Sequence, residues 1–261
     1  MPRLTLRIHP DSATLLREAA DAEHGFRMEG VLLAVRQGGI RDDIYREAGA
    51  AGFPGWFDPP VVIFGELPDR IGATRRVPLT EDERAVLLER LMASHGGRIF
   101  GRLTRPADFV DPLDSLFGEL VAEGITPDRF DEAVARAHTH EEWDRERNHA
   151  LAAIYRAYRA AIETAAGPDP RRDGRDMYLD IAEALRADPA KIIERLHGRR
   201  ELRILGLSDL RGGWRGLIQA LRESAVFERI TIYALDDHLV RVEGLNPDET
   251  SRENLSTVDG R

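Results

Sequence analysis

Residues 201–235, ELRILGLSDLRGGWRGLIQALRESAVFERITIYAL, decide the fold class of this chain. The stretch combines a buried strand, a polar turn, an amphipathic helix and a second buried strand, which is the repeating unit of an open parallel α/β sheet. In nucleotide-binding sheets, an acid that binds Mg²⁺ stands at the end of one such strand. This chain has Leu205 before Gly206 at that place. The sequence therefore predicts the architecture of a nucleotide-binding sheet without the acid of an ATPase.

The first 70 residues show the same alternation of strands and helices. Strands are expected at 4–8, 30–35 and 61–67, and helices at 12–25 and 40–52. The run GVLLAV at 30–35 is apolar throughout, which is typical of a strand buried on both faces of a parallel sheet. Either Asp11 or Ser12 is expected to cap the first helix. These strands and those after residue 200 should lie in one sheet.

The middle of the chain has a helical pattern without a convincing strand. We therefore expect one α/β domain split between residues 1–77 and 198–245, with an all-helical insertion over 78–197. The segment 246–261, NPDETSRENLSTVDGR, is polar and is expected to be disordered.

Composition limits the function classes. The 261 residues include no cysteine, which excludes disulfides and thiolate metal sites, and no apolar run reaches the length of a membrane span. We expect a cytoplasmic protein without a membrane partner. The formal net charge is −9, and Lys191 is the only lysine. This acidic balance argues against tight autonomous DNA binding, because duplex affinity depends largely on phosphate neutralisation.

Four stretches together resemble AddB-type subunits of bacterial helicase–nucleases, which belong to the UvrD-like helicases. They are LDSLFGELVAEGITPDRFDEAV (113–134), LAAIYRAYRAAIE (151–163), RDMYLDIAEAL (175–185) and RELRILGLSDLRGGWRGLIQALRES (200–224). The similarity is strongest over residues 98–235. It implies a RecA-like, P-loop NTPase-like parallel sheet interrupted by a large helical insertion.

The chain departs from that family at the nucleotide site. A phosphate loop needs several glycines and a lysine, whereas residues 9–14 read HPDSAT, with a proline that lacks an N–H group. Ser12, Thr14, Leu205 and Asp209 mark the positions of a degenerate site. A nuclease centre with an Asp…Glu-x-Lys pattern cannot be completed either, because Lys191 follows Ala190. We therefore expect no catalytic residues, no metal and no cofactor.

Two arginine groups are the candidates for DNA or phosphate contacts, since guanidinium groups bind phosphate in a bidentate manner. The alternative is a solvated charged surface. The candidates are Arg171, Arg172, Arg175, Arg195, Arg199, Arg200 and Arg203.

Other side chains allow a functional or a structural interpretation. His138 and His140 could bind a metal or begin a solvated helix, and their spacing favours the helix. Tyr155 and Tyr158 could stack on bases, but their spacing beside apolar residues favours a core position.

These observations predict a non-catalytic, helicase-like module of DNA repair or recombination. Its expected partner is a nuclease or helicase subunit, and single-stranded or duplex DNA is the second candidate partner. Two alternatives stay open: a protein-interaction or vestigial domain that does not bind DNA, and an atypical nucleotide-binding enzyme.

Overall fold

The chain folds into two compact units. A computed structural model describes residues 2–72, 76–100, 107–137, 141–164, 171–206, 212–235 and 247–252. Residues 1–74 and 178–261 form the sheet unit, and residues 75–177 form the helical unit. The insertion that we expected over 78–197 thus differs at its carboxyl end. The helices after residue 177 belong to the sheet unit, within which Ile181, Leu185 and Ile192 are buried.

The sheet unit contains a fully parallel sheet. Its strands are β1 (Arg3–His9), β2 (Val31–Val35), β3 (Val61–Ile63), β6 (Glu201–Leu205) and β7 (Arg229–Leu235), in the order β3-β2-β6-β7-β1. A short β8 (Glu249–Arg252) adds to the outer edge of β1. The expectation that the N-terminal strands and those after residue 200 share one parallel sheet is confirmed for these strands.

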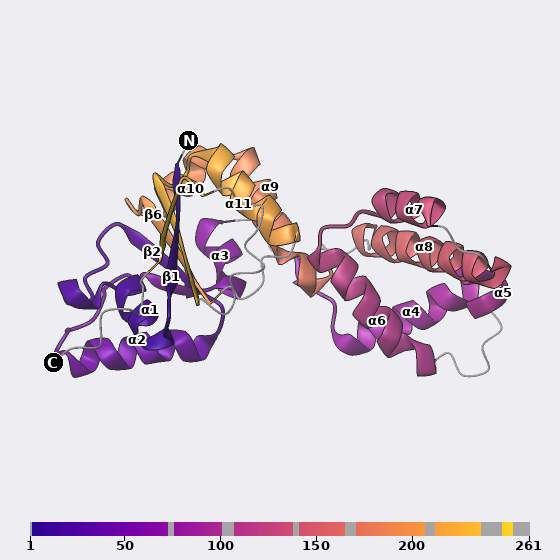
Figure 1. The fold of residues 1–261 in the computed structure, drawn as a ribbon, viewed down its shortest axis with the longest axis horizontal. Coiled ribbons are helices and arrows are strands. Elements are labelled where there is room, and N and C mark those ends of the chain that lie inside the picture. The colour runs from indigo at the N-terminus through magenta and orange to yellow at the C-terminus, as the bar shows by residue number, and fades with distance from the viewer. Residues whose placement is uncertain are drawn as a thin grey trace. The chain divides into compact units, whose positions relative to one another are not determined.

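Helices cover both faces of this sheet (Figure 1). One face carries α1 (Ser12–Ala19) and α2 (Gly38–Ala50), and the other carries α3 (Leu67–Ile71), α9 (Met177–Ala187), α10 (Pro189–Arg195) and α11 (Gly212–Ser224). All five residues of β2 are buried. Val31, Leu33 and Val35 pack with α1 and α2, so the alternating Leu32 and Ala34 face the other helices. The apolar run is thus explained by helices on both sides.

Two segments of the sheet unit differ from the sequence expectation. The strand expected over 61–67 ends at Ile63, because residues Phe64–Glu66 form a 3₁₀ helix. Glu66 accepts a hydrogen bond from the Ile63 backbone N–H at 3.2 Å. In the expected disordered tail, β8 forms beside β1. Asp248 precedes it and accepts a hydrogen bond from the Leu4 N–H at 2.7 Å. Residues 253–261 lie outside the described residues.

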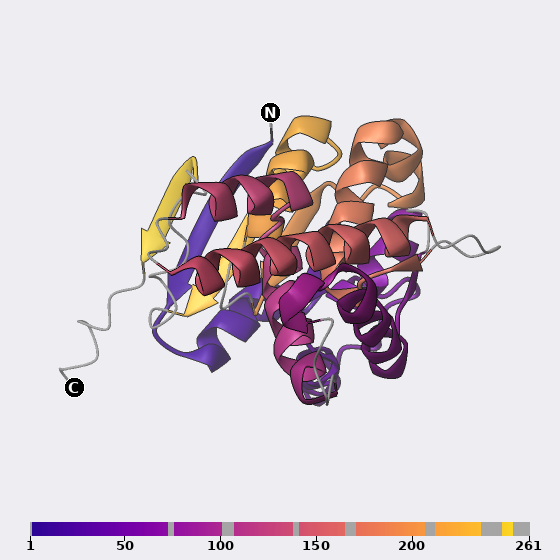
Figure 2. The same ribbon diagram turned by 90° about the vertical axis from the view of Figure 1, so that its right-hand side faces the viewer.

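The helical unit is built around its longest helix. It comprises α4 (Glu81–His95), α5 (Gly97–Phe100), α6 (Ala107–Ala122), α7 (Pro127–Arg136) and α8 (Glu142–Glu163), and Figure 2 shows α7 beside α8. Tyr155 and Tyr158 of α8 are 1% and 0% exposed and pack on Phe117. Their predicted core position is confirmed.

A short ribbon pairs the two chain ends of the helical unit, and an ionic network follows it. A two-residue parallel ribbon of β4 (Val77–Pro78) and β5 (Arg171–Arg172), which the sequence did not predict, is followed by the fully buried Asp173. This carboxylate accepts hydrogen bonds from the Tyr158 hydroxyl at 2.7 Å and from Arg175 at 2.6 and 2.7 Å. Arg175 also donates to Asp114 on α6. A buried carboxylate with this many donors is held in its charged form.

We expect Asp173→Asn to destabilise the helical unit by about 3 kcal/mol, because it leaves Arg175 without its nearest buried counter-charge. Burial alone would raise the pKa of Asp173, but the hydrogen bonds from Arg175 and Tyr158 outweigh it and lower that pKa. The stabilisation is therefore complete above the unfolded-state pKa of about 3.9 and is lost as the pH falls through the lower folded-state value.

Urea unfolding followed by circular dichroism between pH 3 and pH 7 measures both effects. Asp128→Asn is the matched control, since Asp128 is an exposed partner of Arg156, and it should change stability by less than about 0.5 kcal/mol. Equal effects of the two substitutions would contradict the structural role of Asp173.

Candidate functional site

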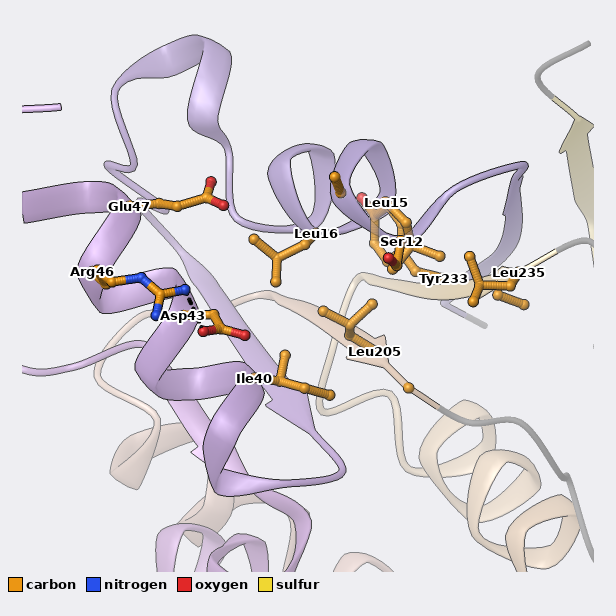
Figure 3. A pocket seen from close by; sticks show the side chains of 13 residues that line it. Ser12, Leu15, Leu16, Ile40, Asp43, Arg46, Glu47, Leu205, Tyr233 and Leu235 are labelled. Atoms are coloured by element: carbon orange, nitrogen blue, oxygen red, sulfur yellow. Dashed lines mark hydrogen bonds and ion pairs between the residues drawn. The ribbon is translucent and has the colours of Figure 1, made fainter. Parts of the chain in front are cut away.

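A cavity of about 400 Å³ lies at the carboxyl end of the sheet, beyond β1, β6 and β7 and between α1 and α2 (Figure 3). Parallel α/β sheets bind ligands at this edge, where the chain leaves neighbouring strands toward opposite faces. Here β2 leads into α2 on one face, while its neighbour β6 is followed along the chain by α11 on the other. The volume lies within the range of small-molecule sites.

One wall of the cavity is apolar. It is formed by residues of α1 and of the strand ends: Ala13, Leu15, Leu16, Leu205, Tyr233, Ala234 and Leu235. Burial raises the pKa of Tyr233 to about 12, so its hydroxyl is neutral at physiological pH. This wall offers packing surface and no formal charge.

The facing wall belongs to α2 and is charged. Asp43, Arg46 and Glu47 line it, beside the apolar Ile40. Arg46 donates to Asp43 at 2.6 Å, an exposed pair three residues apart. Within the described part of the chain, Glu47 has no ion-pair partner. The wall thus carries two carboxylates and one guanidinium.

The turn after β1 places a carboxylate at the N-terminus of α1. Asp11 caps α1 by accepting the Thr14 backbone N–H at 2.8 Å, as the sequence allowed. This hydrogen bond is the largest of the effects that lower the pKa of Asp11, so the group is charged at neutral pH. Helix N-termini bind phosphate through such free N–H groups. Here one of these donors is occupied by an anion, and Ser12, the next residue, lines the cavity.

The end of β6 is closely packed. Leu205 is 2% exposed and belongs to the core that α1 and α2 share with the sheet. Gly206 follows with a φ of +88°, and a Cβ there would meet Arg36 and Ile40 side-chain carbons at 3.3 Å. Leu205 therefore contributes an apolar surface to the cavity. Asp209, the fourth predicted position of the degenerate site, lies outside the described residues, as do His138 and His140.

Most of the candidate phosphate-binding arginines are bound to carboxylates. In the helical unit, Arg171 pairs with Glu83 and Arg175 with Asp173 and Asp114, while Arg172 is half-buried. In the sheet unit, Arg199 is 9% exposed and donates to Asp58 at 2.5 Å. Arg195 is exposed, and so is Arg200, which lies 3.5 Å from Glu228. The sequence grouped these residues, whereas the structure gives most of them separate structural contacts.

Arg203 connects β6 to the end of α1. Its guanidinium donates to the Ala19 carbonyl at 3.0 Å, to Asp21 at 2.9 Å and to Glu201 at 2.7 Å. A guanidinium at a helix C-terminus satisfies free carbonyls and opposes the helix dipole. With its side chain only 12% exposed, Arg203 is held by these contacts within the sheet unit.

The charged wall of α2 was missed by sequence reasoning. Its signal was the spacing of Ile40, Asp43 and Glu47, which places the three side chains on one helical face.

Among the described residues there is no group of three or more side chains suited to a metal ion. No helix in the described ranges has the length and apolar character required to cross a membrane. No protein-family model matches the chain, and no curated protein was found to be similar to it.

We predict that Arg203→Met lowers the free energy of unfolding of the sheet unit by about 3 kcal/mol, because it removes the hydrogen bonds to the Ala19 carbonyl, Asp21 and Glu201. Arg200→Gln, the control three positions away, removes an exposed guanidinium and should cost less than about 0.5 kcal/mol. Chemical unfolding followed by tryptophan fluorescence measures both. If Arg203→Met were as stable as the unsubstituted protein, the stabilising role of the Arg203 contacts between β6 and α1 would be refuted.

Proposed function

We propose that this chain is a non-catalytic, helicase-like module with a RecA-like sheet, which scaffolds a nuclease or helicase partner in DNA repair or recombination. The observation that carries the proposal is the Asp11 carboxylate on the Thr14 N–H. In the proposed RecA-like sheet, the strand-end cavity takes the position of the nucleotide site, and the Asp11 carboxylate lies where a phosphate would bind.

The strand order supports a RecA-like interpretation. The turn after β1 and the end of β6 open onto the same edge, separated by β7. In an active P-loop ATPase, these two places hold the phosphate loop and the Mg²⁺-binding acid. Here they hold the Asp11 cap and Leu205. A buried leucine offers no oxygen to Mg²⁺, which takes oxygen ligands.

Charge pairing favours a protein partner over DNA. Arg171, Arg175, Arg199 and Arg203 each have a carboxylate partner within the chain. Phosphate contacts by these groups would require breaking those pairs. DNA guiding stays as a second candidate because Arg195 and Arg200 are exposed.

The chain should not hydrolyse ATP with Mg²⁺, either alone or with single-stranded DNA. Phosphate release measured with a coupled fluorescent sensor should equal that of a protein-free control. Asp11→Ser, which keeps a capping oxygen but removes the charge, should also be inactive, since Leu205 still provides no metal ligand. Turnover that is abolished by Ser12→Ala or Thr14→Ala would overturn the proposal.

DNA binding is tested by fluorescence anisotropy with a labelled single strand at 20 to 200 mM salt. The scaffold role predicts no binding by the isolated chain at physiological ionic strength. Binding that weakens steeply with salt, and again in the double variant Arg195→Glu with Arg200→Glu, would favour DNA guiding instead. Arg199 is unsuitable for this test because it is 9% exposed and its substitution would remove one of the two arginines that bind Asp58.

A further inference from the structure

We propose that the strand-end cavity binds an amphipathic cation, with an apolar body and a terminal guanidinium, amidinium or ammonium group. The inference rests on the proposed function in one respect only, namely that the cavity does not serve a nucleoside triphosphate. The argument comes from the division of the cavity into an apolar wall and a charged wall (Figure 3).

The apolar wall selects the body of the ligand. Leu15, Leu16, Leu205 and Leu235 line one side of a cavity of about 400 Å³, large enough for an aromatic ring or a branched aliphatic chain. Burying such a group is favourable in proportion to the apolar surface that it removes from water. The strand ends contribute Tyr233 to the same wall with a neutral hydroxyl.

The charged wall selects the sign of the polar end. Arg46 is already hydrogen-bonded to Asp43, and its side chain is 75% exposed. Glu47 lines the cavity and has no ion-pair partner in the described ranges. The two carboxylates outnumber the guanidinium, so a cation that enters gains a charge-assisted hydrogen bond while an anion meets repulsion.

The turn at the start of α1 reinforces this selection. Ser12 and Ala13 line the cavity directly after Asp11, whose carboxylate occupies the Thr14 N–H. The positive end of the helix dipole is therefore partly compensated before any ligand arrives. Phosphates and carboxylates therefore find one donor fewer and a weaker positive field at this helix N-terminus.

Three isosteric probes test the charge preference: benzamidine as the cation, benzamide as the neutral form and benzoate as the anion. Each is titrated into the whole protein at pH 7, and binding is followed by amide chemical shifts of Ser12, Leu16 and Leu235. We expect benzamidine to bind about tenfold more tightly than benzamide, the effect of one hydrogen bond to a charged group, and benzoate to bind least. Equal affinities, tighter binding of benzoate, or no binding of any probe would overturn the inference.

Glu47→Gln should reduce the preference for benzamidine over benzamide to about twofold, since the shape is kept and the charge removed. Asp42→Asn is the matched control, because Asp42 is an exposed neighbour on α2 that does not line the cavity. A preference that survives Glu47→Gln would refute the assignment of the cation to that side chain.

Two further titrations separate the related possibilities. Acetyl-Leu-Arg-amide, compared with benzamidine, distinguishes an arginine side chain of a polypeptide from a small organic cation as the source of the ligand. ATP with Mg²⁺ should leave the three amide signals unchanged. Displacement of benzamidine by ATP would contradict the proposed function, whereas silent ATP together with silent benzamidine would contradict only the cation site.

Discussion

The parallel direction of the strands is the constraint on which the rest of the sheet unit depends. Parallel neighbours need crossover helices, so both faces of the sheet are covered and all carboxyl ends open onto one edge. The burial of all five residues of β2 is the direct sign of this arrangement. The chemistry at this edge therefore depends on three places in the chain. They are the residue that caps α1, the residue that ends β6 and the face of α2 that lines the cavity.

Those positions together change what the edge can bind. Asp11 supplies an anion at the helix N-terminus, Leu205 supplies an apolar surface, and α2 adds Asp43 and Glu47. Each residue is well suited to folding: Asp11 caps a helix and Leu205 fills the core. The residues that stabilise the fold at this edge therefore also set its chemical character.

Local patterns predicted much of this structure from the sequence. The apolar run at 30–35 and the alternation of strands and helices indicated the parallel sheet, and helical periodicity placed Tyr155 and Tyr158 in the core. The roles of the arginines could not be predicted, because their partners are distant in sequence: Arg199 binds Asp58 across 141 positions, and Arg203 binds Asp21 across 182. The early end of β3 was not predicted either, because the apolar pattern of residues 61–67 does not distinguish a strand from the 3₁₀ helix that forms over Phe64–Glu66.

The backbone amide of Thr14 reports most directly on whether the sheet edge is closed to phosphate. Its ¹⁵N–¹H signal should stay unchanged while inorganic pyrophosphate with Mg²⁺ is added to the protein up to millimolar concentration. The reason is that the Thr14 N–H stays hydrogen-bonded to the Asp11 carboxylate, at 2.8 Å. A saturable shift of that signal, with loss of the hydrogen bond to Asp11, would show that phosphate displaces the cap and would contradict the closed edge.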